Sequence, residues 1–380
     1  MVRRPDDADP SNAILVIGPG WVGDMVMAQS LFKALKRDLP SRTIDVITPV
    51  WGQALLERMP EVRDAIPLSV AHGELGMSTR WRLGRSLRGK GYSQAIVLPR
   101  SAKAALIPWL AGIPHRTGYL GEYRYGLLND IRPLDRERHY RTVDRFVALS
   151  SSMPSESKNG TKNSGTATNR IHILKPTLTS SFEQQLATKQ YLELNQGGGA
   201  ARMESVESGT GTILTLCPGA EYGPAKRWPV EYFARLARAY LERGWSVWLL
   251  GSDKDAGITQ EIAGQASGVV DLAGRTTLTQ AIDLLAASTV VVSNDSGLMH
   301  IAAATSTPLV ALYGSSDPQY TPPLSEKAEI IYRGLKCSPC FARDCPLGHL
   351  NCLRGITPQG VSEAVDRALS ANPDICESRP

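Results

Sequence analysis

The segment VVSNDSGLMHIAAA, residues 291–304, is the most informative part of this chain. An apolar run rich in β-branched residues stops at Asp295-Ser296-Gly297, and a helical pattern follows at once. A strand that turns directly into a helix presents backbone N–H groups at the helix N-terminus, which bind anions. Asp295 can accept hydrogen bonds from sugar hydroxyls, and His300 lies one helical turn beyond Ser296. The segment predicts a nucleotide-sugar site, and an ordinarily capped helix is the alternative.

The composition is typical of a globular enzyme. A chain of 380 residues can form two domains with sizeable cores, and 42% hydrophobic and 21% charged residues are ordinary values. A net charge of +5 does not indicate a nucleic-acid partner, and it suits an anionic small substrate or an anionic membrane surface. No apolar run reaches transmembrane length, and the N-terminus lacks the apolar core of a secretion signal. We therefore expect a cytoplasmic protein with mostly reduced cysteines.

Alternating strand and helix patterns predict an α/β fold with two parallel, doubly wound sheets. Polar stretches rich in Ser, Thr, Asn and Gly, at 152–170 and 195–211, predict exposed loops or a linker between the two blocks. Two Rossmann-like domains facing across a cleft would bind ligands at the carboxyl ends of their strands. We expect an N-terminal domain at 1–175, a linker region at 176–211, a C-terminal domain at 212–355, and a final helical region at 356–380 packing back toward the N-terminal domain.

The first strand is followed by Gly18-Pro19-Gly20-Trp21-Val22-Gly23, which matches the dinucleotide-binding pattern GxGxxG. Two features argue against a dinucleotide. Asp24 puts a carboxylate where a pyrophosphate would dock, and the second strand ends in Thr48-Pro49 with no acidic residue to hold a ribose. The alternative is that Asp24 is itself reactive. At a helix N-terminus its ionised form is stabilised, which suits a base that takes a proton from an alcohol. A plain helix cap remains a third interpretation.

A loop fixed by glycines and prolines follows the first strand of the second block, CPGAEYGPAKRWP, residues 217–229. Lys226 and Arg227 would neutralise a diphosphate leaving group if they face the cleft. A solvated basic pair before a helix is the alternative.

Taken together, four segments resemble glycosyltransferase family 9, the lipopolysaccharide heptosyltransferases. They are ILVIGPGWVGDMVMAQSL, HRTGYLGEYRYGLLND, CPGAEYGPAKRWP and NDSGLMHIAAA. The resemblance extends from about residue 12 to 370, and the WVGDMVMAQS and CPGAEYGPAKRWP forms favour the second enzyme type of the family over the first. It implies a GT-B fold and inverting transfer of L-glycero-D-manno-heptose from ADP-heptose to the inner-core heptose of lipopolysaccharide. It implies no required cofactor and no nucleic-acid partner.

The resemblance also implies roles for single residues. Asp24 is similar to the family's catalytic base, and Lys226 to its diphosphate-binding lysine. Asp295 resembles the aspartate that holds the donor sugar. Ser296, Gly297 and His300 match the phosphate-binding turn, and Asp253 resembles a residue near the adenosine ribose, where the family often has Glu. Gly20 stands where a serine is expected.

Four cysteines, Cys337, Cys340, Cys345 and Cys352, have the character of metal ligands, with His349 between them. A structural zinc site would order this segment, which is rich in Pro and Gly. Because the spacings are irregular, a surface disulfide and free thiols stay open as well.

The acceptor would meet the N-terminal domain. Lys103 follows a strand and should face the cleft, and His115 and Arg116 are further candidates. RWRLGRSLRGK, residues 80–90, carries five cations and no acid, so it would suit lipid A and Kdo charges or the anionic inner leaflet, or be a solvated surface. We thus expect a protein peripheral to the cytoplasmic face of the inner membrane that uses heptosyl-Kdo2-lipid A. The alternatives are the first heptosyltransferase type, another family 9 transferase, a dinucleotide-dependent oxidoreductase and a nucleotide-binding protein without catalytic activity.

Overall fold

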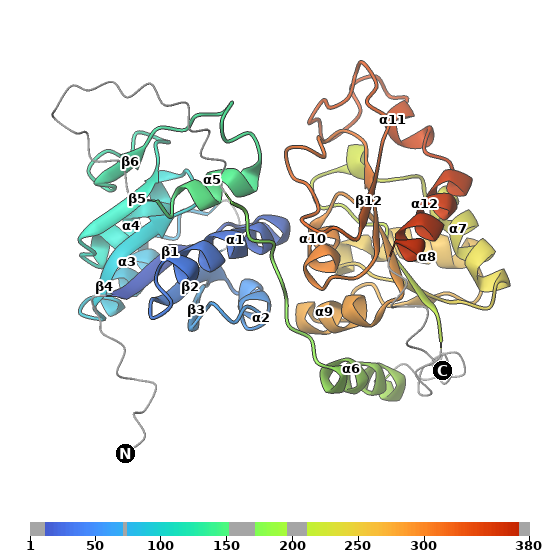
Figure 1. The fold of residues 1–380 in the computed structure, drawn as a ribbon, viewed down its shortest axis with the longest axis horizontal. Helices are drawn as coiled ribbons and strands as arrows, with labels where there is room; N and C mark the ends of the chain where they lie inside the picture. The colour runs from blue at the N-terminus through green and yellow to red at the C-terminus, as the bar shows by residue number, and fades with distance from the viewer. Residues whose placement is uncertain (1–11, 71–73, 152–171, 196–210, 372–380) are drawn as a thin grey trace. The chain divides into compact units, whose positions relative to one another are not determined.

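The computed structural model describes residues 12–70, 74–151, 172–195 and 211–371 (Figure 1). The loops expected at 152–170 and 195–211 lie almost entirely outside these residues. The chain divides into two compact units, one of Met1–Gly20 and Met27–Lys175, the other of Trp21–Val26 and Pro176–Pro380. The short segment Trp21–Val26 therefore packs with the second unit, although the rest of its helix belongs to the first.

The first unit is built on a parallel sheet in the order β3-β2-β1-β4-β5-β6. All five residues of β1 are buried, as expected for a central strand covered on both faces. The strands are β1 (Ala13–Ile17), β2 (Thr43–Pro49), β3 (Asp64–Leu68), β4 (Tyr92–Val97), β5 (His115–Tyr119) and β6 (Asp130–Arg132). The helices are α1 (Val22–Asp38), α2 (Gly52–Leu56), α3 (Met77–Ser86), α4 (Ala102–Leu110) and α5 (Thr142–Ala148).

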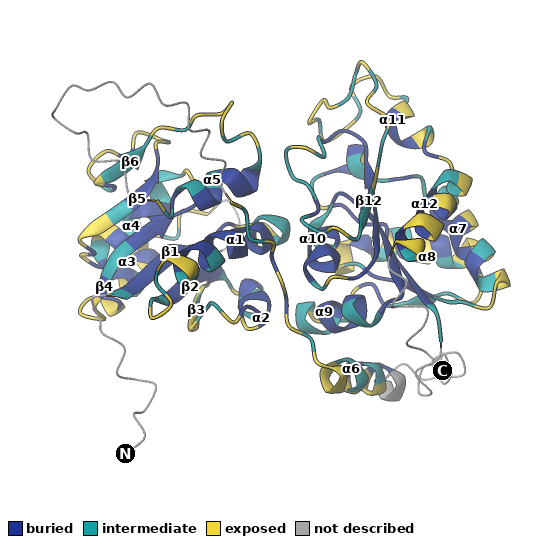
Figure 2. Ribbon diagram, in the orientation of Figure 1, coloured by how far each residue is buried: buried dark blue, intermediate teal, exposed yellow. Residues whose placement is uncertain are grey.

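The second unit repeats this plan in the order β12-β11-β10-β7-β8-β9. Three of its four inner strands, β7, β10 and β11, are completely buried, and Figure 2 shows buried strands at the centre of this unit. The strands are β7 (Ile213–Cys217), β8 (Ser246–Leu249), β9 (Val270–Asp271), β10 (Val290–Asn294), β11 (Leu309–Tyr313) and β12 (Ala328–Tyr332). The helices are α6 (Phe182–Asn195), α7 (Val230–Glu242), α8 (Ala256–Gln265), α9 (Leu278–Ala287), α10 (Gly297–Ala304), α11 (Asn351–Arg354) and α12 (Pro358–Ser370), with 3-10 turns at Pro224–Lys226 and Asp253–Asp255.

Two separate six-stranded sheets confirm the predicted α/β fold of GT-B type. Read from its first strand, each sheet has the Rossmann order 3-2-1-4-5-6, so the strand order reverses between β1 and β4 and again between β7 and β10. Ligands of such folds bind at these reversal points, outside the carboxyl ends of the strands.

The first and last helices of the second unit pack on other elements of the same unit. Helix α6, in the region expected to be a linker, packs on α9. Helix α12 is capped by Thr357, whose hydroxyl accepts the Gly360 N–H, and its buried face lies in the core formed with α7 and the second sheet. The described contacts of α12 give no support to its packing toward the N-terminal domain, which stays a prediction.

The sequence patterns did not predict β5, β6 or β12. Strand β5 begins with the exposed His115 and the half-buried Arg116, and β6 and β12 are the half-exposed outer strands of their sheets. A continuous apolar run in the sequence indicates only those strands that are covered on both faces. No helix in the described part of the chain has the length and apolar character needed to cross a membrane.

Candidate active site

The predicted donor residues gather at the reversal point of the second sheet. Strands β7 and β10 are neighbours and run parallel, so their carboxyl ends meet at one edge. Lys226 lies in the loop that follows β7, and Asp295 directly follows β10. Topology therefore brings together two residues that are 69 positions apart.

The buried side chain of Asn294 fixes the path of the loop that carries Lys226. Its Nδ2 donates to the Pro218 carbonyl at 2.8 Å, and its Oδ1 accepts the Trp228 N–H at 3.0 Å. Both ends of the loop are thus tied to the last residue of β10. Trp228 is 1% exposed and donates its indole N–H to the Ile356 carbonyl, which anchors the loop in the core.

In the loop that these Asn294 hydrogen bonds hold, Lys226 forms an ion pair with Asp295. The Nζ–Oδ2 distance is 2.6 Å, and the side chains are 17% and 5% exposed. The ammonium group also lies 5.1 Å from the centre of the Tyr222 ring, within the range of a cation–π contact. A partly desolvated cation at a strand edge is well suited to a phosphate group.

The first turn of α1 packs closely on α10. A Cβ atom on Gly23 would come within 2.5 Å of His300 Cδ2, and a Cβ on Gly297 within 2.8 Å of Val22 Cβ. Only glycine permits these approaches. Ser296 is the N-cap of α10 but its side chain makes no capping hydrogen bond, so the hydroxyl does not occupy the backbone donors of the first turn.

Asp24 lies in this first turn of α1 and interacts electrostatically with the ion pair. Burial raises its pKa to about 6, against the lowering effect of Lys226 and with a further rise from Asp295. The sequence analysis expected the helix N-terminus to favour the ionised carboxyl, and the loss of solvation acts in the opposite direction. A pKa about one unit below neutrality leaves Asp24 mostly ionised at pH 7 and strengthens it as a proton acceptor.

His300 is neutral at physiological pH. It is 5% exposed, and burial lowers its pKa to about 4. It therefore contributes a neutral imidazole to this site, and the positive charge comes from Lys226.

Near the end of β8, Asp255 rather than Asp253 is the buried carboxylate. Asp253 is exposed, whereas Asp255 accepts hydrogen bonds from the Ser252 N–H and hydroxyl. A Cβ on Gly219 would lie 2.5 Å from Asp255 Oδ1, so this carboxylate reaches the start of the Lys226 loop. The sequence analysis missed Asp255; its capping position, three residues after Ser252, was the available signal.

In the first unit, the structure separates the three acceptor candidates. Lys103 lies in the first turn of α4, shortly after β4 and at the carboxyl edge of the sheet, and its Nζ donates to the Glu74 carbonyl at 3.0 Å. His115 and Arg116 begin β5 and lie at the opposite edge. The Arg116 guanidinium donates to the backbone carbonyls of Ile113 and Leu127, which is a structural role.

A loop after β5 adds aromatic side chains at the carboxyl edge. Tyr123 is 91% exposed and Tyr125 63%. Arg124 between them is buried and donates to the carbonyls of Pro99 and Ser101, next to α4. Glu122 accepts the Ala102 N–H and so holds the loop against the start of α4. The alternation of tyrosines around an arginine was the sequence signal for this loop.

Residues 80–351 match the family model described as Glycosyltransferase family 9 (heptosyltransferase). The chain belongs to glycosyltransferase family 9. It is 44% identical over 361 residues to lipopolysaccharide heptosyltransferase 2 of Escherichia coli K12, covering 94% of this chain and 98% of that protein. It is 47% identical over 324 residues to lipooligosaccharide heptosyltransferase 2 of Haemophilus influenzae, covering 84% and 88%.

A solved structure of Escherichia coli ADP-heptose lipopolysaccharide heptosyltransferase II shares the fold with a TM-score of 0.77 and 42% identity, covering 95% of this chain and 99% of that one. These similarities confirm a glycosyltransferase of the second heptosyltransferase type. They set aside the oxidoreductase interpretation of the glycine-rich turn, in which Gly23 instead serves the contact with His300.

Proposed function

We propose that this family 9 glycosyltransferase transfers L-glycero-D-manno-heptose from ADP-heptose to the first heptose of the lipopolysaccharide inner core. The observation that carries the proposal is the Lys226–Asp295 ion pair, which is coupled to the carboxyl of Asp24. The site combines a cation for the diphosphate, a carboxylate that can accept hydrogen bonds from sugar hydroxyls, and a carboxylate that can accept a proton. Sugar transfer from a nucleoside diphosphate requires these three groups.

In this proposal, Lys226 and the Ser296–Gly297 turn hold the diphosphate, and Asp295 accepts hydrogen bonds from the heptose hydroxyls. Asp24 takes the proton of the acceptor hydroxyl while the oxygen of that hydroxyl attacks the anomeric carbon from the face opposite the diphosphate. The bond from the anomeric carbon to the diphosphate oxygen breaks, and ADP leaves with the electron pair. Lys226 stabilises the charge that develops on the leaving group, so the reaction requires no bound cofactor.

The acceptor, a heptosyl-Kdo2-lipid A, is proposed to meet the first unit at Lys103 and the loop of Tyr123 and Tyr125. Helix α3 supports peripheral contact with an anionic membrane surface. Its Arg82, Arg85 and Trp81 are exposed, and the Arg85 guanidinium lies 4.9 Å from the centre of the Trp81 ring. Arg80, which the sequence grouped with these cations, is instead buried and donates to the Leu75 carbonyl.

The proposal is tested by incubating purified protein with ADP-heptose and mono-heptosylated Kdo2-lipid A, and measuring ADP release and product mass. We expect a gain of one heptose. Kdo2-lipid A without heptose tests the first heptosyltransferase type, and ADP-glucose tests another donor sugar. Transfer to the heptose-free acceptor, or preference for ADP-glucose, would overturn the proposal.

A further inference from the structure

The segment between β12 and α11 has no helix, strand or core of its own. Residues 333–350, all of which the structure describes, form a single irregular connection, and no side chain among them is buried. Connections longer than about 12–15 residues are uncommon in compact domains. Phe341 and Leu350 also adopt positive φ angles, 52° and 50°, which non-glycine residues hold only when their surroundings force it. Something other than apolar burial must order this segment.

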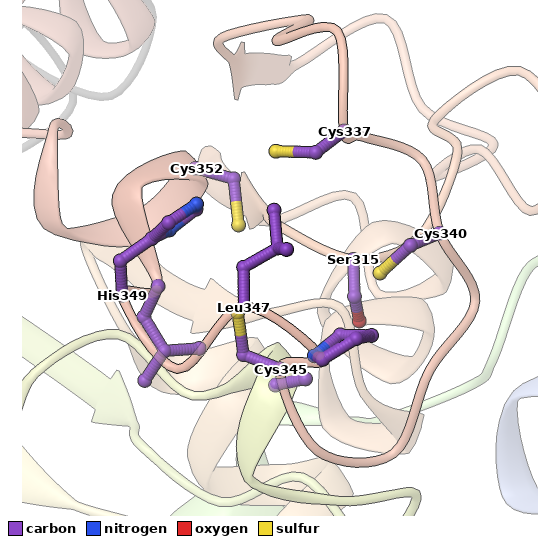
Figure 3. Close-up of a pocket in the computed structure, with 10 residues that line it drawn as sticks. Ser315, Cys337, Cys340, Cys345, Leu347, His349 and Cys352 are labelled. Carbon is purple, nitrogen blue, oxygen red and sulfur yellow. The ribbon is translucent and has the colours of Figure 1, made fainter.

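The four cysteines of this region line one cavity. Cys337, Cys340, Cys345 and Cys352 surround a space of about 130 Å³, and their sulfur atoms point inward around the side chain of Leu347 (Figure 3). All five cysteines that the structure describes are free of disulfides. Three of the four lie in the irregular connection, while Cys352 is buried in α11 and belongs to the core of the second unit. A bond among them would therefore fasten the connection to the core.

The turn after Cys345 is closed by a backbone hydrogen bond. The Gly348 N–H donates to the Cys345 carbonyl at 3.0 Å. Gly348 permits this turn because its φ is +69°. The turn therefore holds Cys345 at the cavity that the other three cysteines line.

The same segment supports the loop that carries Lys226. The Phe341 carbonyl accepts the Tyr222 hydroxyl at 2.6 Å, and Arg343 Nε donates to the Tyr222 carbonyl at 2.8 Å. The Arg343 carbonyl accepts the Ala225 N–H at 2.9 Å, and Ala225 itself lines the cysteine cavity. Tyr222 in turn lies beneath the Lys226 ammonium. Residues 333–350 thus support the loop at 217–229 that carries Lys226.

We propose that Cys337, Cys340, Cys345 and Cys352 bind one tetrahedral Zn²⁺ that orders residues 333–350 and thereby positions Lys226. In the described residues, no three His, Cys, Asp or Glu side chains are already gathered to hold a metal ion. The sulfurs must therefore close inward, with Leu347 moving out; its side chain is 62% exposed and can do so. Each thiol that is still protonated releases its proton to solvent when it binds the metal.

Four thiolates suit Zn²⁺, and a closed four-ligand set is typical of a structural site. His349 is the competing fourth ligand. Its Nδ1 already accepts the Asn351 N–H at 3.0 Å, which leaves only Nε2 for a metal. The four-cysteine set is therefore preferred.

The first test measures zinc, iron and reactive thiols per chain in protein purified under reducing conditions. We expect about one zinc per chain, with the four thiols protected until a mercurial displaces the metal. Cys345→Ser should reduce zinc below about a tenth per chain, whereas Cys217→Ala and His349→Ala should retain it. Should Cys345→Ser fail to fold, mercurial release from the wild-type protein gives the same stoichiometry. Metal-free protein that takes up no added zinc, a disulfide between these cysteines, iron in place of zinc, or zinc loss in His349→Ala would overturn the proposal.

The second test separates positioning of Lys226 from general loss of stability. Removal of zinc should weaken ADP binding about tenfold in the wild-type protein. In a Lys226→Ala background it should change ADP binding less than twofold, because the positioned group is already absent. An equal loss in both backgrounds would contradict the positioning role. Because metal content and ADP binding require no sugar transfer, these results stand or fall separately from the proposed reaction.

Discussion

The Lys226 Nζ lies 2.6 Å from Asp295 Oδ2, so the cation of the proposed donor site is paired with a carboxylate. The pair is largely withdrawn from solvent, and each charge compensates the other's lost hydration. In the proposed reaction, an incoming diphosphate would compete with Asp295 for the ammonium group and would release the carboxylate toward sugar hydroxyls. The ion pair would thereby link recognition of the phosphate to recognition of the sugar.

Replacing Lys226 with alanine should weaken ADP binding. The diphosphate loses its cation, and it also meets an uncompensated Asp295 carboxylate that is 5% exposed. Loss of one such buried charge contact costs about 2–4 kcal/mol, which corresponds to about 30- to 1000-fold in affinity. Calorimetric titration with ADP measures the change.

Lys254→Ala is the matched control, because it removes the same charge from the same unit. Lys254 is exposed and pairs with Glu221 at the surface, so its removal should change ADP affinity less than twofold. Equal ADP affinity in Lys226→Ala and wild-type protein would remove Lys226 from the donor site.

Asp24→Asn should reduce turnover by about 100-fold or more while ADP affinity stays close to wild type. The amide keeps the shape of the side chain but cannot accept a proton. Since burial raises the pKa of Asp24 to about 6, kcat/KM of the wild-type enzyme should fall about tenfold per pH unit below that value. The variant should lack this acid limb in its residual activity. A persistent limb near pH 6 in Asp24→Asn would assign the base to another residue.

The same carboxyl should make the folded protein less stable as pH rises. The pKa of Asp24 is higher in the folded state than its value of 3.8 in an unfolded chain, so the folded state binds the proton more tightly. The destabilisation is absent below pH 3.8, grows between 3.8 and 6, and is complete above 6. Asp24→Asn should therefore raise the stability by about 1–3 kcal/mol at pH 8 and by much less at pH 4. Thermal unfolding at both pH values tests this, with equal shifts contradicting it.

The sequence predicted the central strands well because those strands are covered on both faces. The strands β1, β7, β10 and β11 are completely buried and mostly apolar, with Thr215 in β7 and Ser293 and Asn294 in β10 as the polar exceptions, and hydrophobic burial dominates their placement. Strand β12 could not be read in the same way, since its residues are half-exposed at a sheet edge and carry no clear alternation.

Site residues next to strand ends were predictable for a related reason. Once parallel strands are recognised, topology alone predicts that Lys226 and Asp295 share an edge. The raised pKa of Asp24 was not predictable, because it depends on burial by protein that is distant in sequence. The same limit applies to the Asn294 hydrogen bonds, which join the two ends of a loop more than 65 residues away.

The contact between Gly23 and His300 leads to a final prediction, which distinguishes Gly23 from Gly20 in the same turn. A Cβ atom on Gly23 would come within 2.5 Å of a ring carbon of His300, which is 5% exposed and cannot easily move aside. A Cβ on Gly20 would meet nothing within 4 Å. Gly23→Ala should therefore displace His300 or the first turn of α1, with a loss of about 1–3 kcal/mol in stability and at least tenfold in turnover. Gly20→Ala should change both within error, and thermal unfolding with the heptose-transfer assay measures them. Equal behaviour of the two variants would show that the close approach at Gly23 is not maintained in solution.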